Sequence, residues 1–67
     1  MPIQNILKKL IDEKYSVLVI SRGANVPYMR VYRAVRDGAK LTDEEQGKIK
    51  AFAFVQPAFT RGGNNDD

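Results

Sequence analysis

The sequence of 67 residues contains no cysteine and no histidine. Without cysteine, neither a disulfide framework nor a thiolate metal site can form. Without histidine, the chain also lacks the side chain most often used for acid–base catalysis and metal binding near neutral pH. No apolar run approaches the ~18 residues that a membrane-spanning helix needs, and no secretory leader is visible. We therefore expect a cytoplasmic protein that is not an enzyme and that uses no cofactor or metal.

Positive charge is concentrated in the middle of the chain. The sequence has 11 basic and 8 acidic residues, which gives a net charge of +3. Between Lys14 and Lys40, six basic residues stand against the single acid Asp37, so this segment alone has a surplus of five positive charges. Such a surplus indicates a polyanionic partner, most often nucleic acid. The alternative is a solvated basic surface that binds nothing.

Hydrophobic spacing predicts a small all-α domain of four to five helices. Isoleucine and leucine recur at helical intervals at positions 3, 6, 7, 10 and 11, which predicts a first amphipathic helix. A second helix is expected after the N-cap Ser16. The β-branched run at residues 17–20 is also compatible with a strand. Thr42 and Glu45 have the spacing of a capping box and should begin a fourth helix.

The stretch from Val17 to Gly38 has the spacing of a helix-turn-helix. Asn25 tolerates the left-handed conformation that ends a helix sharply. Pro27 suits the first turn of a new helix, where its fixed φ helps and its missing N–H is not needed. A small residue at Ser21 allows two helices to cross closely, and Val26 is expected to fill the corner between them.

The helix expected at about 27–37 keeps Val31, Ala34 and Val35 for the core. Its other positions combine guanidinium, aromatic and thioether side chains, which suits the reading of base edges in the major groove: Tyr28, Met29, Arg30, Tyr32, Arg33 and Arg36. Tyr28 has an alternative place against the edge of the preceding helix. DNA phosphate contacts are expected from four neighbouring residues: Lys40, Lys14, Arg22 and Ser16.

This pattern resembles the Cro-like helix-turn-helix regulators of phages, whose motif places a small residue, a turn glycine, an apolar residue and a later β-branched residue at fixed offsets. Ser21, Asn25, Val26 and Val31 occupy those places here. Asn25 departs from the preferred glycine, and residues 17–19 are apolar where the family often has polar, phosphate-binding residues. The resemblance implies a DNA-binding transcriptional regulator in a bacterial or phage-infected cell.

By size and simplicity, the chain is similar to the phage autorepressors found beside anti-CRISPR genes. We expect a homodimeric repressor that binds an inverted repeat in double-stranded DNA, with no small-molecule ligand. The main alternative is a small phage-type protein-binding module, an inhibitor or antirepressor, that uses the basic face. RNA binding, with Tyr28 and Tyr32 stacking on unpaired bases, ranks third.

Three bulky apolar residues end the globular part: Phe54, Val55 and Phe59. Pro57 disfavours helix at the residue before it, so the segment is expected as a short extended stretch or a fifth helical turn. Its role is either a lid on the core or a dimer contact, and it is a candidate to cover Leu18 or Val19. We assign residues 1–59 to the helix-turn-helix domain. The polar, glycine-rich residues 60–67 are expected to be a disordered tail.

Overall fold

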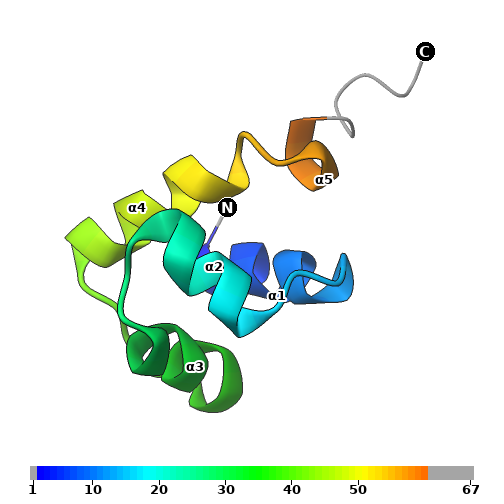
Figure 1. Cartoon of the computed structure of the whole chain (residues 1–67). Coiled ribbons are helices and arrows are strands. Elements are labelled where there is room, and N and C mark those ends of the chain that lie inside the picture. The colour runs from blue at the N-terminus through cyan, green and yellow to red at the C-terminus, as the bar shows by residue number, and fades with distance from the viewer. Residues whose placement is uncertain (1, 61–67) are drawn as a thin grey trace.

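The structure, a computed structural model, describes residues 2–60. This part of the chain folds into five helices (Figure 1): α1 (Ile3–Asp12), α2 (Val17–Ala24), α3 (Tyr28–Asp37), α4 (Asp43–Ala53) and α5 (Pro57–Thr60). No strand occurs in this range, so the all-α prediction is confirmed, including helix rather than strand at residues 17–20. Among the helices of residues 2–60, none is long and apolar enough to pass through a membrane.

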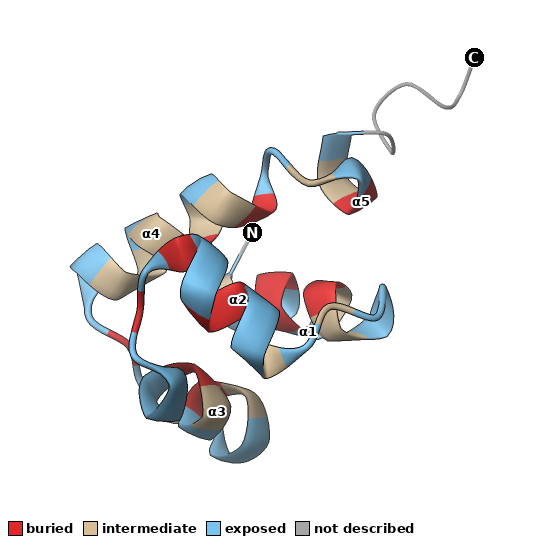
Figure 2. Cartoon of the chain, viewed as in Figure 1, coloured by how far each residue is buried: buried red, intermediate tan, exposed pale blue. Residues whose placement is uncertain are grey.

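The inward faces of α1 to α4 form one hydrophobic core (Figure 2). α2 packs against both α3 and α4, and α1 packs against the same two helices. Most side chains buried in the core are those that the helical spacing predicts, because one face of each helix collects its apolar residues. Ile3, Ile11 and Val35 are only partly buried, and Val26 and Leu41 are buried from the connections between helices. The largest fully buried side chains are Ile6, Leu7, Leu10, Ile20, Val31 and Ile49.

The connection between α1 and α2 turns at Lys14, which has a left-handed backbone with φ of 76°. The N–H of Tyr15 donates to the carbonyl of Leu10 at 2.9 Å, and the N–H of Lys14 donates to that of Ile11 at 3.0 Å. These two bonds form a Schellman motif, which usually has glycine at the left-handed position. A side chain there costs roughly 1–2 kcal/mol. The sequence did not predict this turn, because lysine gives no signal for positive φ.

α2 and α4 approach closely at Gly23. A Cβ atom at this position would overlap the ring carbons Cδ1 and Cε1 of Phe52 and would lie 3.1 Å from Cζ. The Phe52 ring also packs edge-on against Tyr15, with centroids 6.3 Å apart and planes at 87°. The absence of a side chain at Gly23 therefore makes room for a ring that packs α4 against the connection before α2. Gly47, on α4, has open space around it instead.

The C-terminal segment forms the helical turn α5 rather than an extended stretch. Phe59 packs against the core as a lid, and the Lys9 ammonium lies 5.5 Å from the centroid of its ring. Phe54 contacts Phe59 edge to face, with centroids 5.5 Å apart, but remains about half exposed. Val55 is 70% exposed. The lid function therefore applies to Phe59, and a dimer contact stays a prediction for Phe54 and Val55.

The expected cover over α2 is wrong for residues 2–60, because Leu18 is 46% exposed and Val19 is 49% exposed. The physical reason is that the short α5 packs toward α1 through Phe59 and Lys9. Thr60, expected to begin the tail, is the last residue of α5. The rest of the expected tail, residues 61–67, lies outside the described part of the chain.

Candidate nucleic-acid interface

α2 and α3 are joined by the sharp turn 25–27. Asn25 has φ of 61° and ψ of 44°, the left-handed conformation that the sequence predicts. The N–H of Val26 donates to the carbonyl of Ser21 at 3.0 Å, and the Val26 side chain is buried in the corner. Pro27 is the N-cap of α3 and so lies just before the helix rather than within its first turn. The two helices thus meet in a helix-turn-helix arrangement.

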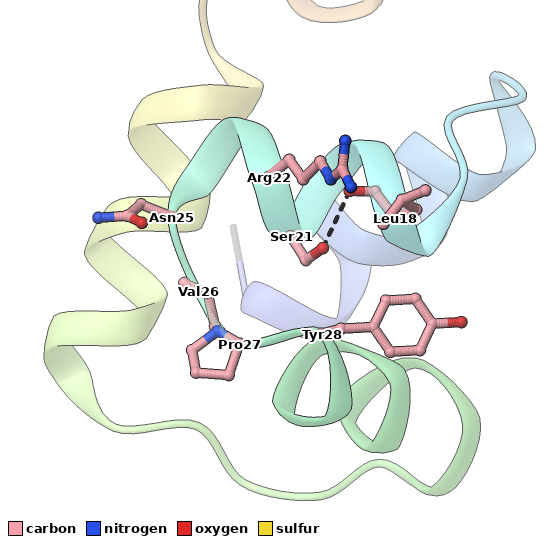
Figure 3. A pocket seen from close by; sticks show the side chains of 7 residues that line it. All are labelled: Leu18, Ser21, Arg22, Asn25, Val26, Pro27 and Tyr28. Atoms are coloured by element: carbon pink, nitrogen blue, oxygen red, sulfur yellow. Dashed lines mark hydrogen bonds between the residues drawn. The ribbon is translucent and has the colours of Figure 1, made fainter.

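A groove lies between α2 and the start of α3 (Figure 3), lined by Leu18, Ser21, Arg22, Asn25, Val26, Pro27 and Tyr28. The Ser21 hydroxyl donates to the carbonyl of Leu18 at 2.9 Å, so this buried polar group is satisfied within α2. Tyr28 lines the groove and is also about half exposed. Its alternative place against the edge of α2 stays a prediction.

The outward face of α3 lies opposite its core-facing residues, which are the buried Val31 and Ala34 and the partly buried Val35. With about 100° between successive residues of a helix, positions 29, 33 and 36 point most directly away from the core. Met29, Arg33 and Arg36 are all exposed, as predicted for groove-reading residues. This face combines two guanidinium groups with one flexible apolar side chain, which matches the hydrogen-bonding edges and thymine methyl groups of the major groove.

Along one side of this face, Tyr28, Tyr32 and Arg36 follow one another at intervals of four residues. The rings of Tyr28 and Tyr32 are stacked, with centroids 6.0 Å apart and planes at 13°. The Arg36 guanidinium donates from Nη1 to the hydroxyl oxygen of Tyr32 at 2.6 Å and lies 5.8 Å from its ring centroid. The spacing of these three residues could have predicted their contacts, since residues at i and i+4 are neighbours on a helix.

Arg30 is engaged differently from the other residues predicted to read bases. It donates from Nε to Oε2 of Glu45 at 2.9 Å and from Nη2 to Oε1 at 2.8 Å. This bidentate ion pair joins α3 to the first turn of α4 and neutralises the charge of Arg30. No local pattern predicts this ion pair, because the two residues are separated along the chain and only the fold brings them together.

Glu45 also completes the predicted capping box of α4. Its N–H donates to the Thr42 hydroxyl at 3.1 Å, and its Oε1 accepts from the Thr42 N–H at 3.0 Å. The hydrogen bonds from Arg30, followed by the bond from the Thr42 backbone, lower the pKa of Glu45 to about 2. The bond to Glu45 in turn raises the pKa of Arg30. The pair therefore stays ionised throughout the physiological pH range.

The four expected phosphate-binding residues are all exposed around the α2–α3 unit. The Ser16 hydroxyl oxygen accepts from the Val19 N–H at 3.1 Å, so it caps α2 and keeps its own proton free to donate. Arg22 borders the groove. Lys14 lies in the connection before α2, and Lys40 lies in the connection after α3. Basic side chains thus stand before, beside and after the two helices.

Comparisons with known proteins found no matching family model, no similar curated protein and no similar solved structure. Within residues 2–60 there is also no group of three or more acidic residues placed to hold a metal ion. A function for this surface has to be inferred from its side chains and their arrangement.

Proposed function

We propose that this chain is a sequence-specific DNA-binding transcriptional regulator that acts as a homodimeric repressor, in the manner of a phage autorepressor. The observation that supports the proposal most is the exposed face of α3. There, Met29, Arg33 and Arg36 project from a helix that a sharp turn sets against α2. A helix held in this way can enter the major groove, where arginine reads guanine and apolar side chains contact thymine methyl groups.

Electrostatics also supports a DNA partner. Of the six basic residues between Lys14 and Lys40, Arg30 is paired with Glu45. The other five remain on the surface around α2 and α3, with Ser16 at the start of α2. Phosphate contacts from such residues fix the position of a protein on the duplex without reading its sequence. Affinity should therefore fall steeply as the salt concentration rises.

Dimerisation follows from the small size of the interface. One recognition helix reads only a few base pairs, and a single small module buries too little surface to select one site in a genome. Two copies related by a two-fold axis double the direct contacts and match the symmetry of an inverted repeat. We propose half-sites about one helical turn, ~34 Å, apart. A bacterial or phage-infected cytoplasm is the compartment in which such a repressor acts.

Selection from a library of randomised duplexes, followed by gel shift and sedimentation on the enriched sequence, tests the proposal. We expect an inverted repeat, two protomers per site, and weaker binding between about 50 and 200 mM salt. Arg33→Ala should remove the preference for one base pair. A wild-type protein that enriches no sequence, or that binds with the same affinity at all salt concentrations, would refute the proposal.

A protein-binding module is the second candidate, and the exposed apolar side chains of Leu18 and Val19, which are neighbours on α2, favour it. Exposed apolar groups that gather on one surface often mark a protein contact. A protein of this kind would not retain specific duplex DNA. The selection experiment therefore separates the two candidates, and competition with single-stranded RNA tests the third.

A further inference from the structure

The three arginines of α3 are in three different states. Arg30 is bound through two nitrogen atoms to Glu45. The guanidinium of Arg33 makes no hydrogen bond or ion pair with any other residue of the range 2–60. Arg36 is held by the hydroxyl of Tyr32. A list of exposed basic residues does not distinguish these states, but they differ in what each guanidinium can do on DNA.

We propose that Tyr32 is a positioning residue that presents Arg36 to a guanine, so that Arg36 and Arg33, and not Arg30, read guanines. This inference rests on the proposed function, since it assigns roles within the same DNA-binding face. Arginine reads guanine through a planar fork onto O6 and N7, which requires a defined orientation of the guanidinium group.

Tyr32 changes where the guanidinium of Arg36 lies. Arg36 belongs to the last turn of α3, whereas the N-terminal part of a recognition helix enters the groove most deeply. Helical side chains lean toward the N-terminus, so Tyr32, four residues earlier, is placed to bind the end of the Arg36 side chain. The 2.6 Å bond therefore draws the guanidinium about one turn back, toward the bases.

Enough donors remain on Arg36 for base recognition. A guanidinium carries five N–H groups, and the bond to Tyr32 uses one of them, at Nη1. A fork onto guanine needs two, and the Tyr32 hydroxyl keeps its own proton for an acceptor on DNA. Arg30 instead uses both Nε and Nη2, one complete edge of its fork, on a carboxylate.

Tyr28 supports this arrangement through the ring of Tyr32. Its ring stacks on Tyr32 with an interplanar angle of 13°, and the Arg36 guanidinium is hydrogen-bonded to the hydroxyl end of the Tyr32 ring. Arginine loses much rotamer freedom when it binds a base. A side chain already held in a single position in the free protein loses less, which favours specific binding.

Tyr32→Phe tests the inference because it removes the hydroxyl and keeps the ring. Fluorescence anisotropy on the selected duplex and on its single-base variants should show that Arg36→Ala abolishes the preference for one guanine. Tyr32→Phe should reduce that same preference about three- to tenfold, the effect of one hydrogen bond. The double variant should lose no more than Arg36→Ala. Tyr15→Phe, which removes a tyrosine hydroxyl outside α3 and leaves the Tyr32–Arg36 bond, is the matched control and should retain the preference for this guanine.

A second measurement does not depend on DNA. In the free protein, ¹⁵N relaxation at Nε should show Arg36 more ordered than Arg33, and Tyr32→Phe should remove that difference. Full guanine preference in Tyr32→Phe, or equal weakening at every base pair, would overturn the inference while leaving the proposed function intact. Equal disorder of the two arginines in the wild type would overturn it as well. A wild type without any sequence preference would instead refute the proposed function, and the relaxation data would then report on the positioning of Arg36 alone.

Discussion

Replacing glycine by alanine should have opposite effects on the stability of the domain at Gly23 in α2 and at Gly47 in α4. In a helix interior, alanine is favoured over glycine by roughly 0.5–1 kcal/mol, because glycine loses more backbone entropy on folding. At Gly47 nothing lies within 4 Å of the added Cβ. Gly47→Ala should therefore raise the free energy of unfolding by about that amount. For a domain of this size, each kcal/mol corresponds to roughly 4–8 °C in Tm.

At Gly23 the same gain is opposed by steric overlap. The new Cβ would meet Cδ1 and Cε1 of Phe52, and these are rigid ring carbons rather than the end of a flexible chain. The ring is held by its edge contact with Tyr15 and by its packing against the core. Overpacking of this kind costs about 1–3 kcal/mol. After the helix-propensity gain is subtracted, Gly23→Ala should destabilise the domain by up to about 2.5 kcal/mol.

Thermal and urea unfolding followed by circular dichroism measure both variants against the wild type. Phe52→Leu should make Gly23→Ala less harmful, because leucine lacks the ring carbons that the Cβ meets. The coupling between these two substitutions should therefore be favourable, whereas Gly47→Ala and Phe52→Leu should be additive. If Gly23→Ala stabilised the domain as much as Gly47→Ala, the close packing of α2 on α4 would be refuted.

Three further predictions concern charge and backbone conformation. Arg30 lowers the pKa of Glu45 from 4.5 to about 2, so the stability that this carboxylate contributes is complete above pH 4.5 and is lost as the pH falls toward 2. In urea unfolding, the free energies of unfolding of the wild type and of Glu45→Gln should differ above pH 4.5 and converge near pH 2. A difference that stays constant with pH would contradict the ion pair. Lys14→Gly should raise the free energy of unfolding by about 0.5–1 kcal/mol, because glycine relieves the left-handed strain at a smaller entropic cost. Lys14→Ala is the control, since it removes the charge but keeps the strain. An equal gain in stability for both variants would point to the charge instead. On the selected duplex, Arg33→Ala should weaken binding by ~1–3 kcal/mol. Arg30→Ala should weaken binding less, because Glu45 already neutralises the charge of Arg30. If Arg33→Ala weakened binding to random DNA by the same amount, Arg33 would be a phosphate contact.

Local signals in the sequence predicted most of the fold. The spacing of isoleucine and leucine in α1, the Ser16 cap of α2, the left-handed Asn25 and the capping box at Thr42 each depend on residues within one or two turns of each other. Interactions between residues so close along the chain can be read directly from the sequence. The flanking residues, and not the periodicity, resolved the ambiguous run at residues 17–20 correctly, because Ser16 and Asn25 are suitable ends for a helix.

Features that depend on distant residues were not predictable in the same way. Nothing near Gly23 in the sequence indicates the Phe52 ring that fills the space beside it. Likewise, Arg30 looks like any other exposed arginine until the fold brings Glu45 to it. Lys14 was missed for another reason: tertiary packing holds a residue with an ordinary side chain in a conformation that its type disfavours. The sequence therefore predicted which residues form the candidate site, but not how the arginines of α3 differ in their partners.

A single carboxylate oxygen of Glu45 accepts from both Arg30 and the N–H of Thr42. The carboxylate of Glu45 therefore joins the exposed helix α3 to the first turn of α4, and this residue lies outside the segment 17–38. If segment 17–38 were grafted onto another scaffold, the side chains proposed to read bases would be kept, but the hydrogen bonds to Glu45 would be lost. Arg30 would regain a free charge, which attracts any polyanion whatever its sequence. In a chimaera, selectivity would thus depend on supplying an acceptor in the place of Glu45, as much as on copying α3.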